Sequence, residues 1–236
     1  MSIYNHTRQP LDRSLRKALE TTVGKAREVA EQAATQALTR LSVGDAKPAD
    51  YLSDAQRSLR NRLRAHGRQL GDSKQDNGQQ SIRKLVTEVA YEHWHRMLFA
   101  RFLEQNQLLM YDEHTPLTLA ECNELVQEPD IARDELEARC TTGWELAGVL
   151  ASKMLPQIFR IDSPVFELEL APEHQRTLEQ LVTGLAPATF QAQDSLGWVY
   201  QFWQSQRKKE VNESEVKIGA DELAPVTQLF TEPYMV

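Results

Sequence analysis

Residues 11–41 read LDRSLRKALETTVGKAREVAEQAATQALTRL, and this stretch decides the fold class of the chain. Apolar residues recur in it every three or four positions, which is the spacing of one face of an α-helix. Alanine is frequent in this stripe, so a partner helix can approach it closely. Gly44 and Pro48 end the predicted helix. The stripe consists of Leu15, Leu19, Val23, Ala26, Ala30, Ala33, Ala37 and Leu41.

Helical spacing of apolar residues continues through most of the chain. Thr118 is a suitable N-cap residue for one of the shorter predicted helices. The alternation in VFELEL, residues 165–170, predicts a strand. The fold class is therefore mainly α, a multi-helix domain with at most one short strand near 165–170. Beyond the first helix, the predicted helices cover residues 48–70, 81–107, 117–127, 131–154, 172–184 and 195–210.

The polar segment GDSKQDNGQQ, residues 71–80, predicts a flexible loop and is the best boundary candidate. It separates a basic helical region, residues 1–70, from a helical core, residues 81–193. Residues 194–236 are expected to form a helix and a connector. The segment from Leu229 to Val236 is strongly apolar, whereas natural domain ends are usually polar, and this indicates a cut inside a longer polypeptide.

The net charge of −7 is unevenly distributed. Residues 1–84 carry 16 lysines and arginines against 9 acidic residues, whereas residues 85–236 carry 11 against 25. Such asymmetry favours either an acidic partner or pairing between the two parts of the chain. No apolar run is long enough for a membrane span, and no signal-peptide pattern opens the chain. The two cysteines, Cys122 and Cys140, are far apart, so we expect reduced thiols and a cytoplasmic protein.

Motifs that carry chemistry are missing from the sequence. His93 and His95 are two residues apart on a predicted helix, so they cannot chelate one ion, and we expect no metal. Nucleophile, phosphate-binding and dinucleotide-binding motifs are absent. The pair Glu215 and Lys217 has the short spacing of a metal-dependent nuclease, but it lies in a polar connector without neighbouring strands. We therefore expect no catalytic residue in this chain.

One basic row stands out in the predicted helix over 48–70. Its arginines succeed one another at steps of three or four residues, opposite the apolar face. A row of guanidinium groups can follow a phosphate backbone and position a protein without reading sequence. The alternatives are a solvated face or pairing with the acidic remainder of the chain. The predicted DNA-binding residues are Arg57, Arg60, Arg64 and Arg68.

Two stretches resemble the PglX-type adenine-specific DNA methyltransferases of BREX phage-defence systems. The stronger is residues 194–236, in which an aromatic helix runs into a charged connector and then into Thr-Gln-Leu-Phe-Thr, residues 227–231. The second is ARFLEQNQL, residues 100–108, preceded by the aromatic-rich EHWHRMLF, and it is similar to a helix near the front of those enzymes. Together they cover roughly a quarter of the chain.

The resemblance implies that Phe230, Thr231 and Tyr234 contribute to an S-adenosylmethionine pocket that opens the catalytic domain. In the commoner form of this element proline directly follows the threonine, whereas this sequence has Glu232 there and then Pro233. The glycine-rich cofactor loop and the Asn-Pro-Pro-Tyr/Phe element, which receives a flipped adenine in the family, have no counterpart in this chain. Chemistry on a base requires such a pocket.

The resemblance therefore implies the N-terminal helical domain of a methyltransferase whose catalytic domain lies outside this chain. This domain would support DNA binding and domain packing and would not be catalytic alone. S-adenosylmethionine would be the cofactor of the parent protein only. DNA, the missing C-terminal methyltransferase domain and other BREX components are the implied partners, with no membrane. The alternative is a stand-alone helical protein-interaction module.

Overall fold

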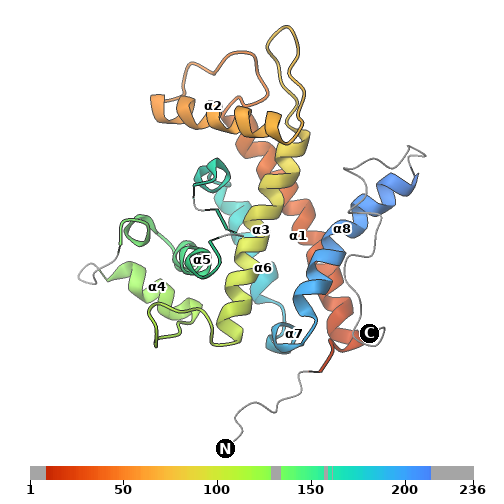
Figure 1. Cartoon of the computed structure of the whole chain (residues 1–236), viewed down its shortest axis with the longest axis vertical. Helices are drawn as coiled ribbons and strands as arrows, with labels where there is room; N and C mark the ends of the chain where they lie inside the picture. Colours follow the sequence, from red (N-terminus) through yellow and green to blue (C-terminus); the bar gives the residue numbers. More distant parts are fainter. Residues whose placement is uncertain (1–8, 129–133, 157–158, 161, 214–236) are drawn as a thin grey trace, which may run out of the picture. The chain divides into compact units, whose positions relative to one another are not determined.

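The computed structural model describes residues 9–128, 134–156, 159–160 and 162–213, and these are mainly helical (Figure 1). No sheet occurs among them, which confirms the predicted fold class; two isolated bridges, Lys74 to Gln80 and Met110 to Pro116, are the strand-like pairings found. None of the helices in these ranges combines the length and apolarity needed to cross a membrane. The contacts group the chain into two compact units, residues 1–26 with 183–236 and residues 27–182.

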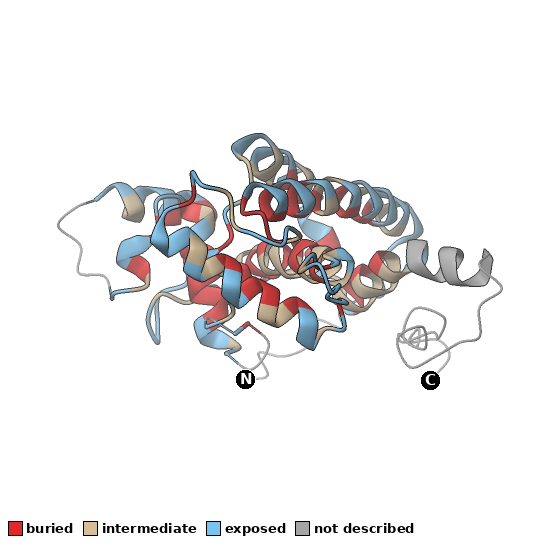
Figure 2. Cartoon of the chain, turned by 90° about the horizontal axis from the view of Figure 1, so that it is seen from above, coloured by how far each residue is buried: buried red, intermediate tan, exposed pale blue. Residues whose placement is uncertain are grey.

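The longest helix is α1 (Arg13–Arg40), and it agrees with the stripe predicted over 11–41. The stripe residues from Leu19 onward are buried, and Ala33, Ala34 and Leu38 are fully excluded from solvent. Burial and exposure alternate along this helix as a helical repeat requires. Figure 2 shows buried and exposed residues in the same kind of alternation on the helices of the described chain.

The second unit continues from α1 through α2 (Asp54–Gln69), α3 (Arg83–Gln105), α4 (Leu119–Gln127), α5 (Gly143–Met154) and α6 (Pro172–Thr183). Helix α5 packs against both α3 and α4, and its inner face is almost continuously buried. Helix α2 packs against α3 and against the short 3-10 helix η2 (Pro164–Glu167). The largest fully buried side chain of α3 is Trp94. Helix α3 therefore contributes to contacts on several sides of this unit.

Capping residues fix where several helices begin. Ser53, Thr118 and Thr142 each accept a hydrogen bond from the backbone three residues later, and a Gln or Glu there returns the bond. The N-cap predicted at Thr118 is thus confirmed. Because Thr142 starts α5, the helix predicted over 131–154 begins later, after the 3-10 helix η1 (Glu137–Arg139). Ser53 likewise delays the start of the helix predicted over 48–70.

The strand predicted at 165–170 is wrong. Helix η2 occupies its first part, with Pro164 at the first helical position and the Ser163 hydroxyl accepting a hydrogen bond from Val165 N. Proline fixes φ near the helical value and cannot donate to a strand ladder. The alternation of apolar residues therefore reflects a 3-10 turn with Val165 and Leu168 buried.

The first unit joins the start of α1 to α7 (Pro187–Gln191) and α8 (Ser195–Glu213). The buried carboxylate of Asp194 accepts hydrogen bonds from Leu11 N at 2.7 Å and from Trp198 Nε1 at 2.8 Å. The guanidinium group of Arg16 lies 4.7 Å from the centroid of the Trp198 ring. Trp198 in turn stacks on Phe202 with centroids 5.3 Å apart. One carboxylate therefore links two segments that are 183 residues apart in the sequence.

Candidate nucleic-acid interface

Helix α2 carries the four arginines that the sequence predicts as DNA contacts. Its capping box sets the helical register: Ser53 Oγ accepts from Gln56 N at 3.2 Å, and Gln56 Oε1 accepts from Ser53 N at 3.0 Å. From this start the arginines follow one another along one side of the helix. The structure divides them into two buried and two more accessible residues.

Arg60 is one of the buried pair, with 4% of its surface exposed. Its Nε donates to Ser42 O at 2.9 Å and its Nη2 to Asp45 O at 2.6 Å. Ser42 has a φ of 53°, in the left-handed region that few non-glycine residues adopt. The guanidinium group of Arg60 therefore stabilises a turn that the backbone alone disfavours.

Arg64 is the other buried arginine, with 7% exposed. Its Nη1 donates to Val43 O and Asp45 O, both at 2.6 Å, and its Nη2 donates to Gly78 O at 2.8 Å. A guanidinium group offers five donors in a fixed plane, so one side chain can join three carbonyl groups. Arg64 thus connects α2 to the turn at residues 42–46 and to the loop at residues 71–82.

Arg57 and Arg68 are more accessible. Arg57 is partly exposed and donates to the carbonyl groups of Leu52, Ala49 and Asp50 at 2.9 to 3.3 Å. Arg68 is exposed and donates one hydrogen bond to Gln80 Oε1 at 3.1 Å. These two guanidinium groups keep surface that an external phosphate can approach.

Positive charge is distributed along most of α2. Burial lowers the pKa of both Arg60 and Arg64. The neighbouring Arg64 lowers the pKa of Arg60 further, and Arg68 does the same to Arg64. Asp45 acts on both pKa values in the opposite direction. Arginine remains a cation in proteins despite such shifts. The buried pair therefore adds positive potential beneath the surface while its donors are directed at carbonyl groups of this chain.

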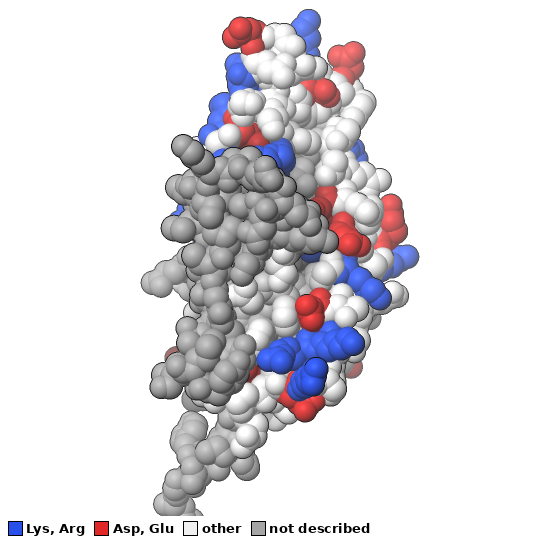
Figure 3. Space-filling model, turned by 90° about the vertical axis from the view of Figure 1, so that its right-hand side faces the viewer, with Lys and Arg blue, Asp and Glu red and all other residues white. Residues whose placement is uncertain are grey.

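Further basic residues flank α2 that sequence reasoning did not single out. Lys47, Lys74 and Arg83 are all exposed, and no described residue is bonded to their side chains. They lie in loops or at a helix start, where helical periodicity gives no signal. In the sequence, the signal that points to these lysines and this arginine is the excess of basic over acidic residues in residues 1–84. On the face shown in Figure 3, basic and acidic side chains are interspersed.

The loop after α2 is held by buried polar groups. Asp72 accepts hydrogen bonds from Lys84 N at 2.9 Å, Leu85 N at 3.0 Å and Ser81 Oγ at 3.2 Å. The buried Gln80 donates to Arg64 O at 2.9 Å. Asp72 therefore holds the loop against the start of α3, and Gln80 holds it against α2, because buried polar groups are stable only with partners.

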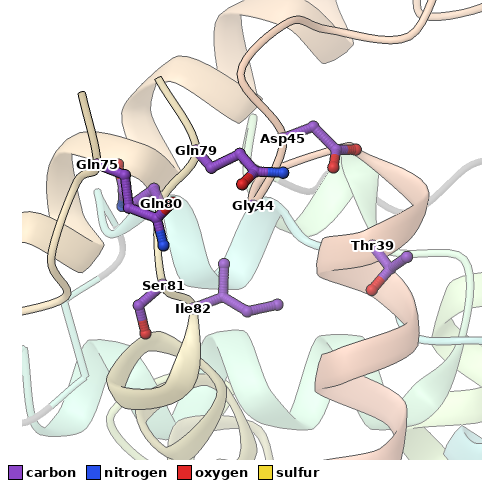
Figure 4. A pocket seen from close by; sticks show the side chains of 8 residues that line it. All are labelled: Thr39, Gly44, Asp45, Gln75, Gln79, Gln80, Ser81 and Ile82. Atoms are coloured by element: carbon purple, nitrogen blue, oxygen red, sulfur yellow. The ribbon is translucent and has the colours of Figure 1, made fainter. Parts of the chain in front are cut away.

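A hollow of about 370 Å³ lies beside this loop (Figure 4). Figure 4 shows Gln75, Gln79 and Gln80 on one side and Thr39 of α1 on the other, with Ile82 between them. Its lining is rich in side-chain amides, which both donate and accept hydrogen bonds. Gly44 and Asp45 complete the wall, so the hollow adjoins the backbone that Arg60 and Arg64 hold.

The two histidines of α3 lie in different surroundings. His93 has Nε2 3.0 Å from Val165 O, and His95 stacks on Tyr91 with ring centroids 5.0 Å apart. Burial lowers the pKa of each histidine to about 4. Within the described ranges no three His, Cys, Asp or Glu residues are grouped so that they would hold a metal ion.

Cys122 and Cys140 are both buried, and they are not joined in a disulfide bond. Burial raises the pKa of Cys122 to about 12, and Glu104 and Glu121 add to this. Because the thiolate is the reactive form, Cys122 is an unreactive thiol at neutral pH.

The remaining predicted sites lie outside the described residues. These are the cofactor residues Phe230, Thr231 and Tyr234, together with Glu215 and Lys217 of the nuclease-like spacing.

No protein-family profile and no solved structure matches this chain. A curated protein of Lacticaseibacillus casei (strain Zhang), named adenine-specific methyltransferase PglX, is 24% identical to it over 216 residues. The match covers 78% of this chain and 18% of that protein. The chain therefore spans a small part of the length of the relative that it matches, and it is distantly related to that part of PglX.

Proposed function

We propose that this chain is a helical N-terminal domain of an S-adenosylmethionine-dependent, adenine-specific DNA methyltransferase of a BREX phage-defence system. The observation that carries the proposal is the similarity to PglX over 78% of the chain. In the parent protein a methyl group would pass from S-adenosylmethionine to the amino nitrogen of adenine. This domain would support DNA binding and would pack against the catalytic domain, without being catalytic alone.

The arrangement around α2 supports a DNA-contacting role in which the accessible arginines contact DNA and the buried arginines stabilise the surrounding backbone. Arg57 and Arg68 would contact phosphate groups, and the exposed Lys74 would add to them. Arg60 and Arg64 would hold the turn and loop in place from beneath. Phosphate contacts of this kind give affinity that depends on salt and not on sequence.

Two further assignments belong to this proposal. Phe230, Thr231 and Tyr234 would contribute to the S-adenosylmethionine pocket of the parent protein. The other components of the defence system would be protein partners in the cytoplasm. One residue that lines the amide-rich hollow of Figure 4, Gln80, accepts a hydrogen bond from the predicted DNA-contacting residue Arg68.

The DNA contact is tested by fluorescence anisotropy with a labelled duplex over a range of salt concentrations. The double variant Arg68→Gln with Lys74→Gln is expected to weaken binding and to reduce the magnitude of the slope of log K against log salt by about two, because each lost phosphate contact contributes about 0.9. Arg139→Gln with Arg176→Gln removes the same charge from exposed positions elsewhere and serves as the control. Equal slopes for the two double variants contradict the DNA-contacting role.

The parent activity is tested on the gene. Translation of the reading frame beyond codon 236 is expected to reveal an Asn-Pro-Pro-Tyr or Asn-Pro-Pro-Phe element. Expression of that longer product in a host without adenine methylation should then produce methylated adenine in its DNA. An in-frame stop at this point contradicts the proposal and favours a stand-alone interaction module.

A further inference from the structure

A second cavity, of about 380 Å³, lies in the unit formed by residues 27–182 and is separate from the arginines of α2. Three elements form its walls: the middle of α3, the start of α5, and the segment from η2 to α6. Its volume falls within the range of small-molecule sites, roughly 300 to 1,000 Å³. Residues that define its chemistry are Arg96, Met97, Trp144, Glu145, Phe166 and Glu169.

Arg96 is the unusual member of this lining. Its guanidinium group lies 4.7 Å from the centroid of the Phe166 ring, and no described residue accepts a hydrogen bond from it or pairs with it. Burial lowers the pKa of Arg96, whereas Cys140, Glu145 and Glu92 act in the opposite direction. By contrast, Arg60 and Arg64 have carbonyl acceptors, and Arg101 pairs with Glu104. A largely buried cation with unused donors is costly unless an acceptor reaches it.

Space is kept for this guanidinium group by a glycine. A Cβ at Gly148 of α5 would lie 2.4 Å from Arg96 Nε and 3.0 Å from its Cζ. The guanidinium plane is therefore held between the backbone of α5 and the Phe166 ring. Such confinement reduces the conformational entropy that ligand binding would otherwise cost.

Acidic side chains lie at the exposed part of the lining. Glu145 and Glu169 are exposed, whereas Arg96 is mostly covered. Glu145 Oε2 accepts hydrogen bonds from Thr141 N at 2.6 Å and Thr142 N at 3.3 Å, which orients this carboxylate at the start of α5. A ligand with several negative charges would be repelled here, so neither a phosphate dianion nor a nucleic-acid backbone suits the cavity.

We propose that this cavity binds a small molecule that has one carboxylate and an aromatic or other apolar body. The carboxylate accepts hydrogen bonds from Arg96, since a guanidinium group and a carboxylate match in geometry and charge. Trp144 and Phe166, with Met97, contact the apolar body. This site does not depend on DNA binding or on the parent methyltransferase.

Saturation-transfer NMR on the 236-residue protein tests the proposal with three probes of similar shape. Phenylacetate is expected to bind, phenylacetamide to bind at least several-fold more weakly, and phenethylamine not to bind. Arg96→Gln should abolish the preference for the carboxylate over the amide. Equal binding of the acid and the amide, stronger binding of the amine, or no binding of phenylacetate at millimolar concentration overturns the proposal.

A variant at the exposed rim covers the case in which Arg96→Gln does not fold. Glu169→Gln removes a like charge near the ligand and is expected to tighten phenylacetate binding about two- to threefold. Glu173→Gln makes the same change at an exposed position of α6 outside the lining and is the matched control. Unchanged affinity in Glu169→Gln, or an equal gain in Glu173→Gln, contradicts the assignment.

Discussion

The guanidinium group of Arg64 donates a 2.8 Å hydrogen bond to the carbonyl oxygen of Gly78, 14 residues further along the chain. This contact fastens the loop after α2 to the helix itself. Gly78 has a φ of 88°, a conformation that side-chain-bearing residues rarely adopt. The arginine and the glycine therefore act together, because the turn directs its carbonyl group toward the donor.

Arg64→Gln is expected to lower the free energy of unfolding by about 3 kcal/mol, since buried carbonyl groups of Val43, Asp45 and Gly78 lose their donor. Arg62→Gln, on the same helix, removes an exposed ion pair with Glu167 and should cost at most about 1 kcal/mol. Urea unfolding followed by circular dichroism measures both. Equal losses in the two variants would show that the buried donors add no stability.

The N-cap of α5 offers a test of local helix stability. Thr142→Ala removes the acceptor for Glu145 N and should cost about 1 kcal/mol. Thr177→Ala makes the same change at an exposed interior position of α6, where alanine is the better helix former, so stability should be unchanged or slightly higher. Thermal unfolding of both variants compares them. A lower melting temperature in Thr177→Ala than in Thr142→Ala would contradict this account.

Glu92 gives the stability a defined pH dependence. Burial raises the pKa of Glu92 to about 7, and Glu88 adds to this, whereas Arg160 and Arg96 oppose it. Between pH 4.5 and about 7 the folded protein holds a proton that the unfolded chain releases, so this group's contribution to stability is lost as the pH rises.

Glu92→Gln should therefore be more stable than the wild type at pH 8, and the difference should shrink toward pH 4.5. Urea unfolding at several pH values measures it, with Glu173→Gln as the exposed control. If the difference in stability between Glu92→Gln and the wild type stays constant with pH, the pH dependence does not come from Glu92.

Asp194 is expected to stabilise the fold of the first unit, residues 1–26 with 183–236. Asp194→Ala leaves two donors, Leu11 N and Trp198 Nε1, without their acceptor, and should cost about 2 to 3 kcal/mol. Asp76→Ala removes an exposed carboxylate from the loop after α2 and should have little effect. Urea unfolding followed by the summed fluorescence of the four tryptophans, of which Trp198 is one, measures the stability of each variant. Wild-type stability of Asp194→Ala would contradict the role given to this carboxylate.

Local sequence patterns were sufficient for most helices. The stripe with Leu19, Val23 and Ala26 predicts α1 because helix burial follows a repeat that can be counted along the chain. The N-cap at Thr118 was also predictable from local sequence, because its hydrogen bond joins two residues only three positions apart. The strand at 165–170 was wrong because Pro164 and Ser163 favour a 3-10 turn over the apolar alternation.

The surroundings of the arginines could not be predicted in this way. Periodicity places Arg60 and Arg64 opposite the apolar face, which normally means exposure to solvent. Their burial depends on carbonyl groups from residues 42–45 and 78, and these come from turns whose position local patterns do not determine. The cavity at Arg96 is formed by three separated segments and likewise leaves no motif in the sequence.

The contact between Leu11 and Asp194 also has a consequence for the order of events during protein synthesis. The unit of residues 27–182 is continuous, so it can acquire its contacts as it leaves the ribosome. Until residue 194 has been translated, Leu11 N at the start of α1 has no acceptor, and this part of the helix lacks the later segment of its unit, residues 183–236. During translation, the early part of this helix is therefore the segment that a chaperone would be expected to bind.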